Sequence, residues 1–187
     1  MTIYMDHNAT TPLRAEVREA MAPYLEDRFG NASSVHAFGR EAAKGINRAR
    51  EQVAGALGCA PEEVVFTGGG TEADNLAIKG VADTRWGRDV HIVTTAMEHH
   101  AVLHTCQYLE GRGVSVTYLP VDEHGIVDRE DVRNAITEET VLVSVMHANN
   151  EVGSIQPIAE IGRVTRDHSV LFHADAVQSF GKLSTKV

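Results

Sequence analysis

Polar residues follow three short apolar runs of this sequence and could act together. The segment "LFHADAVQSF" places Asp175 just after one run, with Gln178 three residues further on. The segment "TTAMEHHAVLHT" places His99 after a second run, and "VMHANNEVG" places Asn150 after a third. Open parallel α/β sheets bind their ligands at the carboxyl ends of the strands. We therefore expect these side chains at one edge of such a sheet.

A fourth loop, "FTGGGTEADN", has the composition of an anion-binding turn. Three glycines ending at Gly70 follow an apolar run, and Thr71 with Asp74 forms a helix-capping pattern. Glycines let backbone N–H groups approach an anion, and a helix N-terminus adds partial positive charge. The lysine of a P-loop and the G-x-G-x-x-G spacing are both absent. The loop is compatible with a phosphate cradle and equally with a tight turn before a capped helix.

Asp175 has no Arg or Lys within several residues, so it needs another cationic partner if it is buried. The pyridinium nitrogen of pyridoxal phosphate is such a partner, and it is typically paired with an Asp. The helix at Gly70 would then hold the phosphate, and His99 would lie on the ring. An asparagine of the Asn-Asn pair suits the phenolic oxygen or a substrate carboxylate. The four loops together predict a pyridoxal phosphate site, although each alone is compatible with an ordinary turn.

Histidines offer a competing interpretation of the loop around His99. His100 and His104 lie four residues apart and would share a helix face, which suits zinc. No H-E-x-x-H motif is present, and no third ligand lies nearby in the sequence. We expect a structural role for His100 and His104 and no metal site.

The elements that must position these loops alternate between short β-branched runs and longer helical stretches. The expected strands cover 63–67, 90–95, 114–119, 140–146 and 170–173. The expected helices cover 14–25, 38–57, 71–85, 100–112, 128–136 and 157–167. Such alternation predicts an α/β fold with a mostly parallel sheet and helices on both faces. Residues 1–13 fit neither period and are expected to form an arm.

Composition narrows the class of protein. The chain has 187 residues, 43% of them hydrophobic, and its formal charge of −9 is spread along the sequence. That charge argues against a nucleic-acid or anionic-membrane surface. No secretory signal is visible, and no apolar run approaches the ~18 residues of a membrane span. Two cysteines are too few for a disulfide framework, so we expect a cytoplasmic protein.

The motifs together resemble the class V aminotransferase family, and more narrowly its NifS/IscS-type cysteine desulfurases. The matching stretches extend over the whole chain and read "YMDHNATTP", "FGNASSVHAFGREA", "FTGGGTEADNLAI", "EHHAVL", "HANNEVGSIQPI" and "HADAVQSFGK". The sequence departs from the family in "GGGT", where Ser-Gly-Ala-Thr is more usual. The extra glycine is expected to loosen this loop without abolishing binding.

The resemblance implies a role for each candidate residue. Gly70 and Thr71 would bind the cofactor phosphate, and His99 would stack on the ring and take part in proton transfer. Asn150 would lie near the phenolic oxygen and the substrate carboxylate. Asp175 would pair with the pyridine nitrogen, and Gln178 would contact the phenolic oxygen.

The resemblance also implies the organisation and the activity. Residues 1–13 would be an arm belonging to the small domain, and residues 14–187 a partial large domain of the fold-type I pyridoxal phosphate enzymes. The complete enzyme would be a homodimer that converts L-cysteine to L-alanine and an enzyme persulfide. The persulfide would then pass to a scaffold protein for iron–sulfur clusters. Selenocysteine or a related amino acid stays open as the substrate.

Two chemical groups of the family have no counterpart in the sequence up to Val187. The lysine that forms the Schiff base and the cysteine that accepts sulfur would lie further on, and Lys182, Lys186, Cys59 and Cys106 stand in the wrong contexts. We therefore expect a truncated chain that turns over cysteine negligibly by itself. A non-catalytic half-fold that binds the cofactor or a partner, or one half of a two-chain enzyme, is the alternative.

Overall fold

The structure is a computed structural model that describes residues 2–85, 87 and 89–186. The chain divides into two compact units. One unit comprises Met1–Phe66 with Ser184–Val187, and the other comprises Thr67–Leu183. All six candidate site residues belong to the second unit.

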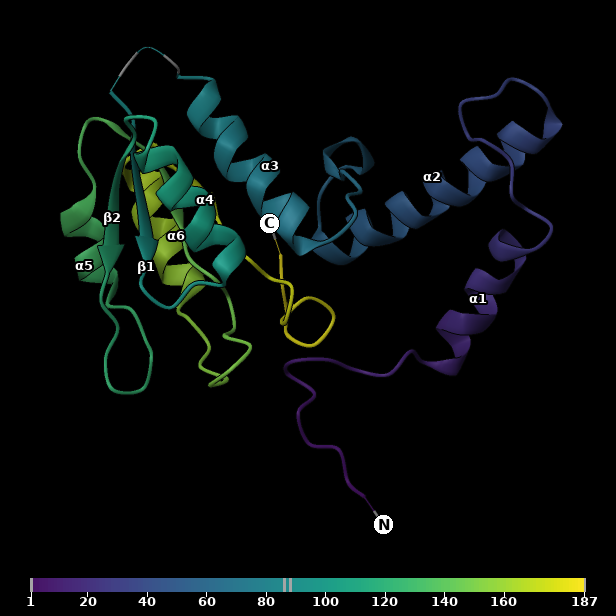
Figure 1. Cartoon of the computed structure of the whole chain (residues 1–187), viewed down its shortest axis with the longest axis horizontal. Coiled ribbons are helices and arrows are strands. Elements are labelled where there is room, and N and C mark those ends of the chain that lie inside the picture. Colours follow the sequence, from purple (N-terminus) through teal and green to yellow (C-terminus); the bar gives the residue numbers. More distant parts are fainter. Residues whose placement is uncertain (1, 86, 88, 187) are drawn as a thin grey trace. The chain divides into compact units, whose positions relative to one another are not determined.

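The second unit is a parallel α/β layer structure (Figure 1). Its helices are α3 (Gly70–Asp83), α4 (His100–Glu110), α5 (Arg129–Ala135) and α6 (Ile158–Asp167). Its strands are β1 (His91–Thr95), β2 (Ser115–Leu119), β3 (Thr140–Ser144) and β4 (Leu171–His173). All neighbouring strands pair in parallel, in the order β2-β1-β3-β4. The predicted parallel sheet is thereby confirmed.

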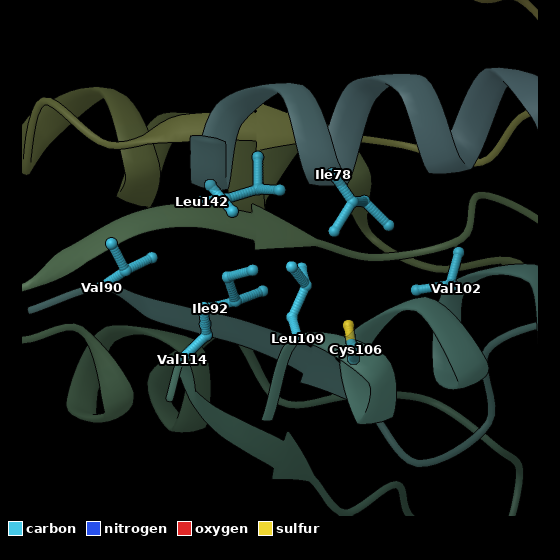
Figure 2. Packing of buried hydrophobic residues seen from close by; sticks show 9 residues of the cluster. Ile78, Val90, Ile92, Val102, Cys106, Leu109, Val114 and Leu142 are labelled. Carbon is cyan, nitrogen blue, oxygen red and sulfur yellow. The ribbon is translucent and has the colours of Figure 1, made fainter. Parts of the chain in front are cut away.

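Helices α3 and α4 cover one face of this sheet. Ile92 of β1 and Leu142 of β3 belong to a buried cluster with Ile78 of α3 and Leu109 of α4. Figure 2 shows the side chains of Ile78, Ile92 and Leu109 pointing toward one another. Apolar residues at the right helical spacing thus hold both helices against the strands.

The opposite face is covered by α5 and α6. Successive strand residues point to opposite sides, so Val93 and Val143 face away from the first cluster. They lie in a second buried cluster with Val132 of α5 and Ile161 of α6. The predicted placement of helices on both faces is therefore confirmed.

The first unit consists of α1 (Ala15–Leu25), α2 (Ala37–Leu57) and the short 3-10 helix η1 (Pro61–Glu63). Residues 2–14 contain no helix or strand. Helix α2 ends at Gly58, whose φ of +82° is a left-handed conformation that glycine adopts without strain. Within the described ranges, no helix is both long and apolar enough to cross a membrane.

The predicted strand over 63–67 is wrong. Its first residue ends η1, and the following residues are irregular. Val65 and Phe66 are 69% and 50% exposed, respectively. A β-branched run forms a strand only when a neighbouring strand pairs with it, and in the described part of the chain this segment pairs with none.

Candidate functional site

The N-terminus of α3 meets the loop that follows β4. A Cβ atom added to Gly70 would lie 2.6 Å from Cγ2 of Val177, two residues beyond Asp175. A Cβ atom at position 70 would force the Val177 side chain to move, so the close approach favours glycine. The first backbone N–H groups of a helix have no partner within it, so this end of α3 offers donors beside the Asp175 loop.

The predicted capping of α3 by Thr71 and Asp74 is wrong. The helix begins at Gly70 after Gly69, without a side-chain cap, and Thr71 is exposed in the first turn. The carboxylate of Glu72 instead accepts a hydrogen bond from the backbone N–H of Gly68 at 2.6 Å. Asp74 is buried, and its carboxylate lies against His173 instead of capping the helix.

Asp175 lies just beyond the carboxyl end of β4 and is 8% exposed. Its Oδ1 accepts a hydrogen bond from the Val177 N–H at 2.9 Å, and its carbonyl accepts one from the His147 N–H at 2.8 Å. Burial raises the pKa of Asp175, and the nearby Asp74 raises it too, against the opposing effects of the Val177 hydrogen bond, His173 and His99. A cation bound at this carboxyl group would relieve the cost of its ionisation.

A chain of polar groups, buried except for the half-buried His173, precedes Asp175. Nδ1 of His173 is 2.8 Å from Oγ of Ser144, and its Nε2 is 3.5 Å from Oδ1 of Asp74. Register places Thr94, Ser144 and His173 side by side across three strands. This row belongs to the face covered by α3, so the sheet and α3 together fix the imidazole next to the Asp175 loop.

His99 is the N-cap residue of α4. Its Nδ1 accepts a hydrogen bond from the backbone N–H of Ala101 at 3.1 Å. The neutral ring therefore carries its proton on Nε2, which is the nitrogen left to exchange protons with a ligand. The His99 side chain is exposed, and its charge is among the weaker effects that lower the pKa of Asp175.

Glu98 ties the loop after β1 to the end of β3. Its Oε1 and Oε2 accept hydrogen bonds from the Met146 N–H at 2.9 and 3.0 Å. Oε1 also accepts one from the Thr95 hydroxyl at 2.7 Å. Sequence reasoning did not single out this glutamate, since nothing in "MEHH" reveals a partner 48 residues away.

The two adjacent asparagines have different surroundings. Asn149 is buried, and its Nδ2 donates to the carbonyl of Met97 at 3.1 Å. Its Oδ1 accepts from the N–H groups of Glu151 and Val152 at 2.8 and 2.9 Å. Asn149 thus shapes the loop after β3 and ties it to the loop after β1, while Asn150 is only half-buried.

Gln178 lies half-buried in the turn after Asp175. Its Oε1 accepts a hydrogen bond from Nζ of Lys182 at 3.3 Å. The structure therefore places the lysine within reach of this amide, one turn further along the chain.

The imidazole rings of His100 and His104 stack at 4.9 Å on the exposed side of α4. Across residues 2–85, 87 and 89–186, no group of three or more His, Cys, Asp or Glu side chains could hold a metal ion. Cys106 is buried, and burial raises the pKa of its thiol to about 12. A thiol in this state is a poor nucleophile.

The structure thus brings four loops to one edge of the sheet. The contacts are Gly70 with Val177, His147 with Asp175, Glu98 with Met146, and Asn149 with Met97. A helix N-terminus, a buried acid and a histidine thus lie at one edge of a parallel α/β sheet, which is where such sheets bind their ligands.

Comparison with known proteins identifies the family. The family described as Aminotransferase class-V matches residues 3–187. The cysteine desulfurase IscS of Methanosarcina thermophila is 52% identical over 185 residues, which are 99% of this chain and 46% of that protein. The cysteine desulfurase IscS of Dictyoglomus turgidum is 50% identical over 185 residues, which are 99% and 47% of the two chains.

Solved structures of related proteins have the same fold over the whole of this chain. A NifS-like protein superposes with a TM-score of 0.96 at 42% identity, covering all of this chain and 52% of its own. SspA in complex with cysteine gives a TM-score of 0.96 at 44% identity, covering all of this chain and 54% of its own.

This chain belongs to the class V aminotransferase family, and the resemblance to its NifS/IscS-type cysteine desulfurases is confirmed. The family consists of enzymes whose cofactor is pyridoxal phosphate. The chain spans about half the length of the curated relatives it matches.

Proposed function

We propose that this chain supplies the cofactor-binding part of a pyridoxal phosphate-dependent cysteine desulfurase. The observation that carries the proposal is the contact between the N-terminus of α3, at Gly70, and the loop that holds the buried Asp175. A site for this cofactor needs hydrogen-bond donors for the phosphate at one end and an acid for the pyridinium nitrogen at the other. The contact brings the N–H groups of α3 and the acid Asp175 together.

The residues present fit this cofactor. Gly70 and Thr71 would bind its phosphate with their backbone N–H groups, and Asp175 would hold the protonated nitrogen. The raised pKa of Asp175 supports this role, because a buried acid gains most from a cationic partner. His99 would stack on the ring, with Asn150 and Gln178 near the phenolic oxygen.

When bound, pyridoxal phosphate supplies an electron sink for chemistry at the α-carbon of an amino acid. The chain's own contribution is then to bind, orient and move protons. Asp175 would hold the protonated ring nitrogen, and the Nε2–H of His99 would face the exposed side of the site as a proton donor. The substrate we propose is L-cysteine, with L-alanine as product and sulfur transferred to a protein thiol. The names of the relatives and a neighbour solved with cysteine support this choice.

The wider context of the reaction is proposed with it. Residues 14–187 would form part of the cofactor-binding large domain, and residues 1–13 an arm of the small domain. The partners would be a second copy of the whole protein and a scaffold protein for iron–sulfur clusters. A cytoplasmic location stays a prediction.

Comparing pyridoxal phosphate with pyridoxal, which lacks only the phosphate, tests the proposal. We expect the chain to bind the phosphorylated form at least roughly 10-fold more tightly, because the N–H groups at the start of α3 gain an anionic partner. Equilibrium dialysis of the 187-residue chain measures both affinities. Equal binding of the two compounds would contradict a phosphate site at Gly70. A Gln107→Ala variant, at an exposed position of α4 outside the proposed site, is the control and should bind both compounds as the unmodified chain does.

A further inference from the structure

Glu98 is a buried acid with an unusual set of neighbours. It is 5% exposed, and three hydrogen bonds from the Met146 N–H and the Thr95 hydroxyl reach its carboxylate. Strand β3 ends at Ser144, so Met146 lies just beyond the ladder that joins β3 to β1. The carboxylate therefore bridges these two segments where their backbone pairing has ended.

The next residue along the chain is His99. Its backbone begins α4, and its Nδ1 receives the Ala101 N–H. A side chain that fixes residue 98 to β3 also fixes the position from which the His99 ring is presented. We infer that Glu98 is a positioning residue, whose carboxylate anchors the β1–α4 loop to β3 and so holds the His99 imidazole in its capping orientation and its Nε2–H form.

This anchor responds to pH near neutrality. Burial raises the pKa of Glu98 to about 7, while its hydrogen bonds from Met146 and Thr95 lower it. The folded chain thus holds a proton on Glu98 in a range where the unfolded chain has lost it. Protonation of Glu98 therefore stabilises the fold, and this contribution falls as the pH rises from 4.5 through about 7.

Other titratable groups surround Glu98 and must be separated from it. Asp175 and His173, from β4 and the loop after it, act on its charge, and Cys106 of α4 is itself affected by Glu98. Asp74 of α3 acts on Asp175 and contacts His173. A measurement must therefore report on individual residues rather than on the whole protein.

The test compares the chain with its Glu98→Gln and Glu98→Ala variants by NMR. In the unmodified chain, we expect the amide resonances of Met146 and Ala101 to shift in one common step near pH 7. Because the Ala101 N–H donates to the His99 ring, the ring resonances of His99 are followed in the same titration, and only the step that Ala101 shares with Met146 is assigned to Glu98. Glu98→Gln should abolish that step in both amides and keep the Nε2–H form of His99, because the amide oxygen still accepts from Met146. Glu98→Ala should mix the two tautomers of His99 and speed hydrogen exchange of the Ala101 amide roughly fivefold, as expected for a lost cap.

A Glu63→Gln variant is the matched control. Glu63 is an exposed glutamate that also accepts a backbone hydrogen bond, from Ala60 at 2.7 Å, and its replacement should leave His99 and Met146 unchanged. The inference is overturned if the pH step reaches Met146 but not Ala101, or if the step survives in Glu98→Gln. It is also overturned if Glu98→Ala folds and keeps a single His99 tautomer. If that variant does not fold, Glu98→Gln decides alone.

The importance of His99 orientation for catalysis rests on the proposed function. The NMR measurements use no cofactor, so they can succeed or fail independently of the binding of pyridoxal phosphate. Failure of the Glu98 anchor leaves the phosphate-dependence of ligand binding untouched, and the reverse also holds.

Discussion

Replacing Asp175 with Asn is expected to weaken the binding of pyridoxal phosphate by roughly 100-fold, or about 3 kcal/mol. The substitution keeps the size of the side chain and the acceptor for the Val177 N–H. It removes the negative charge that we propose faces the protonated ring nitrogen. A charge-assisted hydrogen bond in a buried position is worth more than a neutral one. Equilibrium dialysis measures the loss.

The same substitution should stabilise the chain when no ligand is present. Burial and the neighbouring Asp74 both raise the pKa of Asp175, so its ionised form is costly in the folded state near neutral pH. The neutral amide of the Asp175→Asn variant carries no such cost, and the urea midpoint of unfolding should rise. An Asp89→Asn change at an exposed position in the loop before β1 is the control, and neither quantity should change. Weaker binding together with lower stability would point to a damaged fold instead of a lost ion pair.

Much of the fold was predictable because the spacing of apolar residues along the sequence indicates which side chains are buried. Ile92 and Val93 are adjacent and both fully buried, which is the pattern of a strand covered on its two faces. The expected helices all form, within two residues of their predicted ends. The segment 63–67 has the same composition as a strand, but composition does not reveal whether a pairing partner exists.

Only part of the candidate site was predictable from the sequence. Side chains at strand ends, such as Asp175 and His99, follow from the order of strands and loops. Asp74 and Glu98 do not, because their partners lie far away in the sequence and on other elements. Asp74 was predicted to be a capping residue because Asp is common at helix N-termini. Short-range patterns identified residues at the ends of strands, whereas only the packed structure reveals which distant groups contact Asp74 and Glu98.

The Asn-Asn pair illustrates the same limit within two residues. Sequence alone gives both side chains equal chemistry, and the turn context does not separate them. In the structure, Asn149 uses its amide to hold the loop, through Met97 and Glu151. Asn150 is left as the more accessible of the two, and its role at the cofactor stays a prediction.

The two buried clusters should contribute independently to stability, and truncating either should be severe. Ile78→Ala on the α3 face and Ile161→Ala on the α6 face are each expected to lower the free energy of unfolding by about 3 kcal/mol. Both side chains are completely buried, so each change removes apolar contacts and leaves a cavity. Urea unfolding followed by circular dichroism measures the loss. Ile155→Ala, at a position that is 52% exposed, is the control and should cost less than about 0.5 kcal/mol.

Milder changes test the independence of the two faces. Ile78→Val and Ile161→Val should each cost about 1 kcal/mol, and the double variant about 2 kcal/mol. Ile78 and Ile161 belong to separate clusters on opposite faces of the sheet, so they share no packing partner whose movement could couple them. If the losses in unfolding free energy depart from additivity by more than about 0.5 kcal/mol, then a packing change on one face of the sheet alters packing on the other. In that case β1 and β3, whose ends carry the loops of His99 and Asn150, would transmit packing changes from either face to the site.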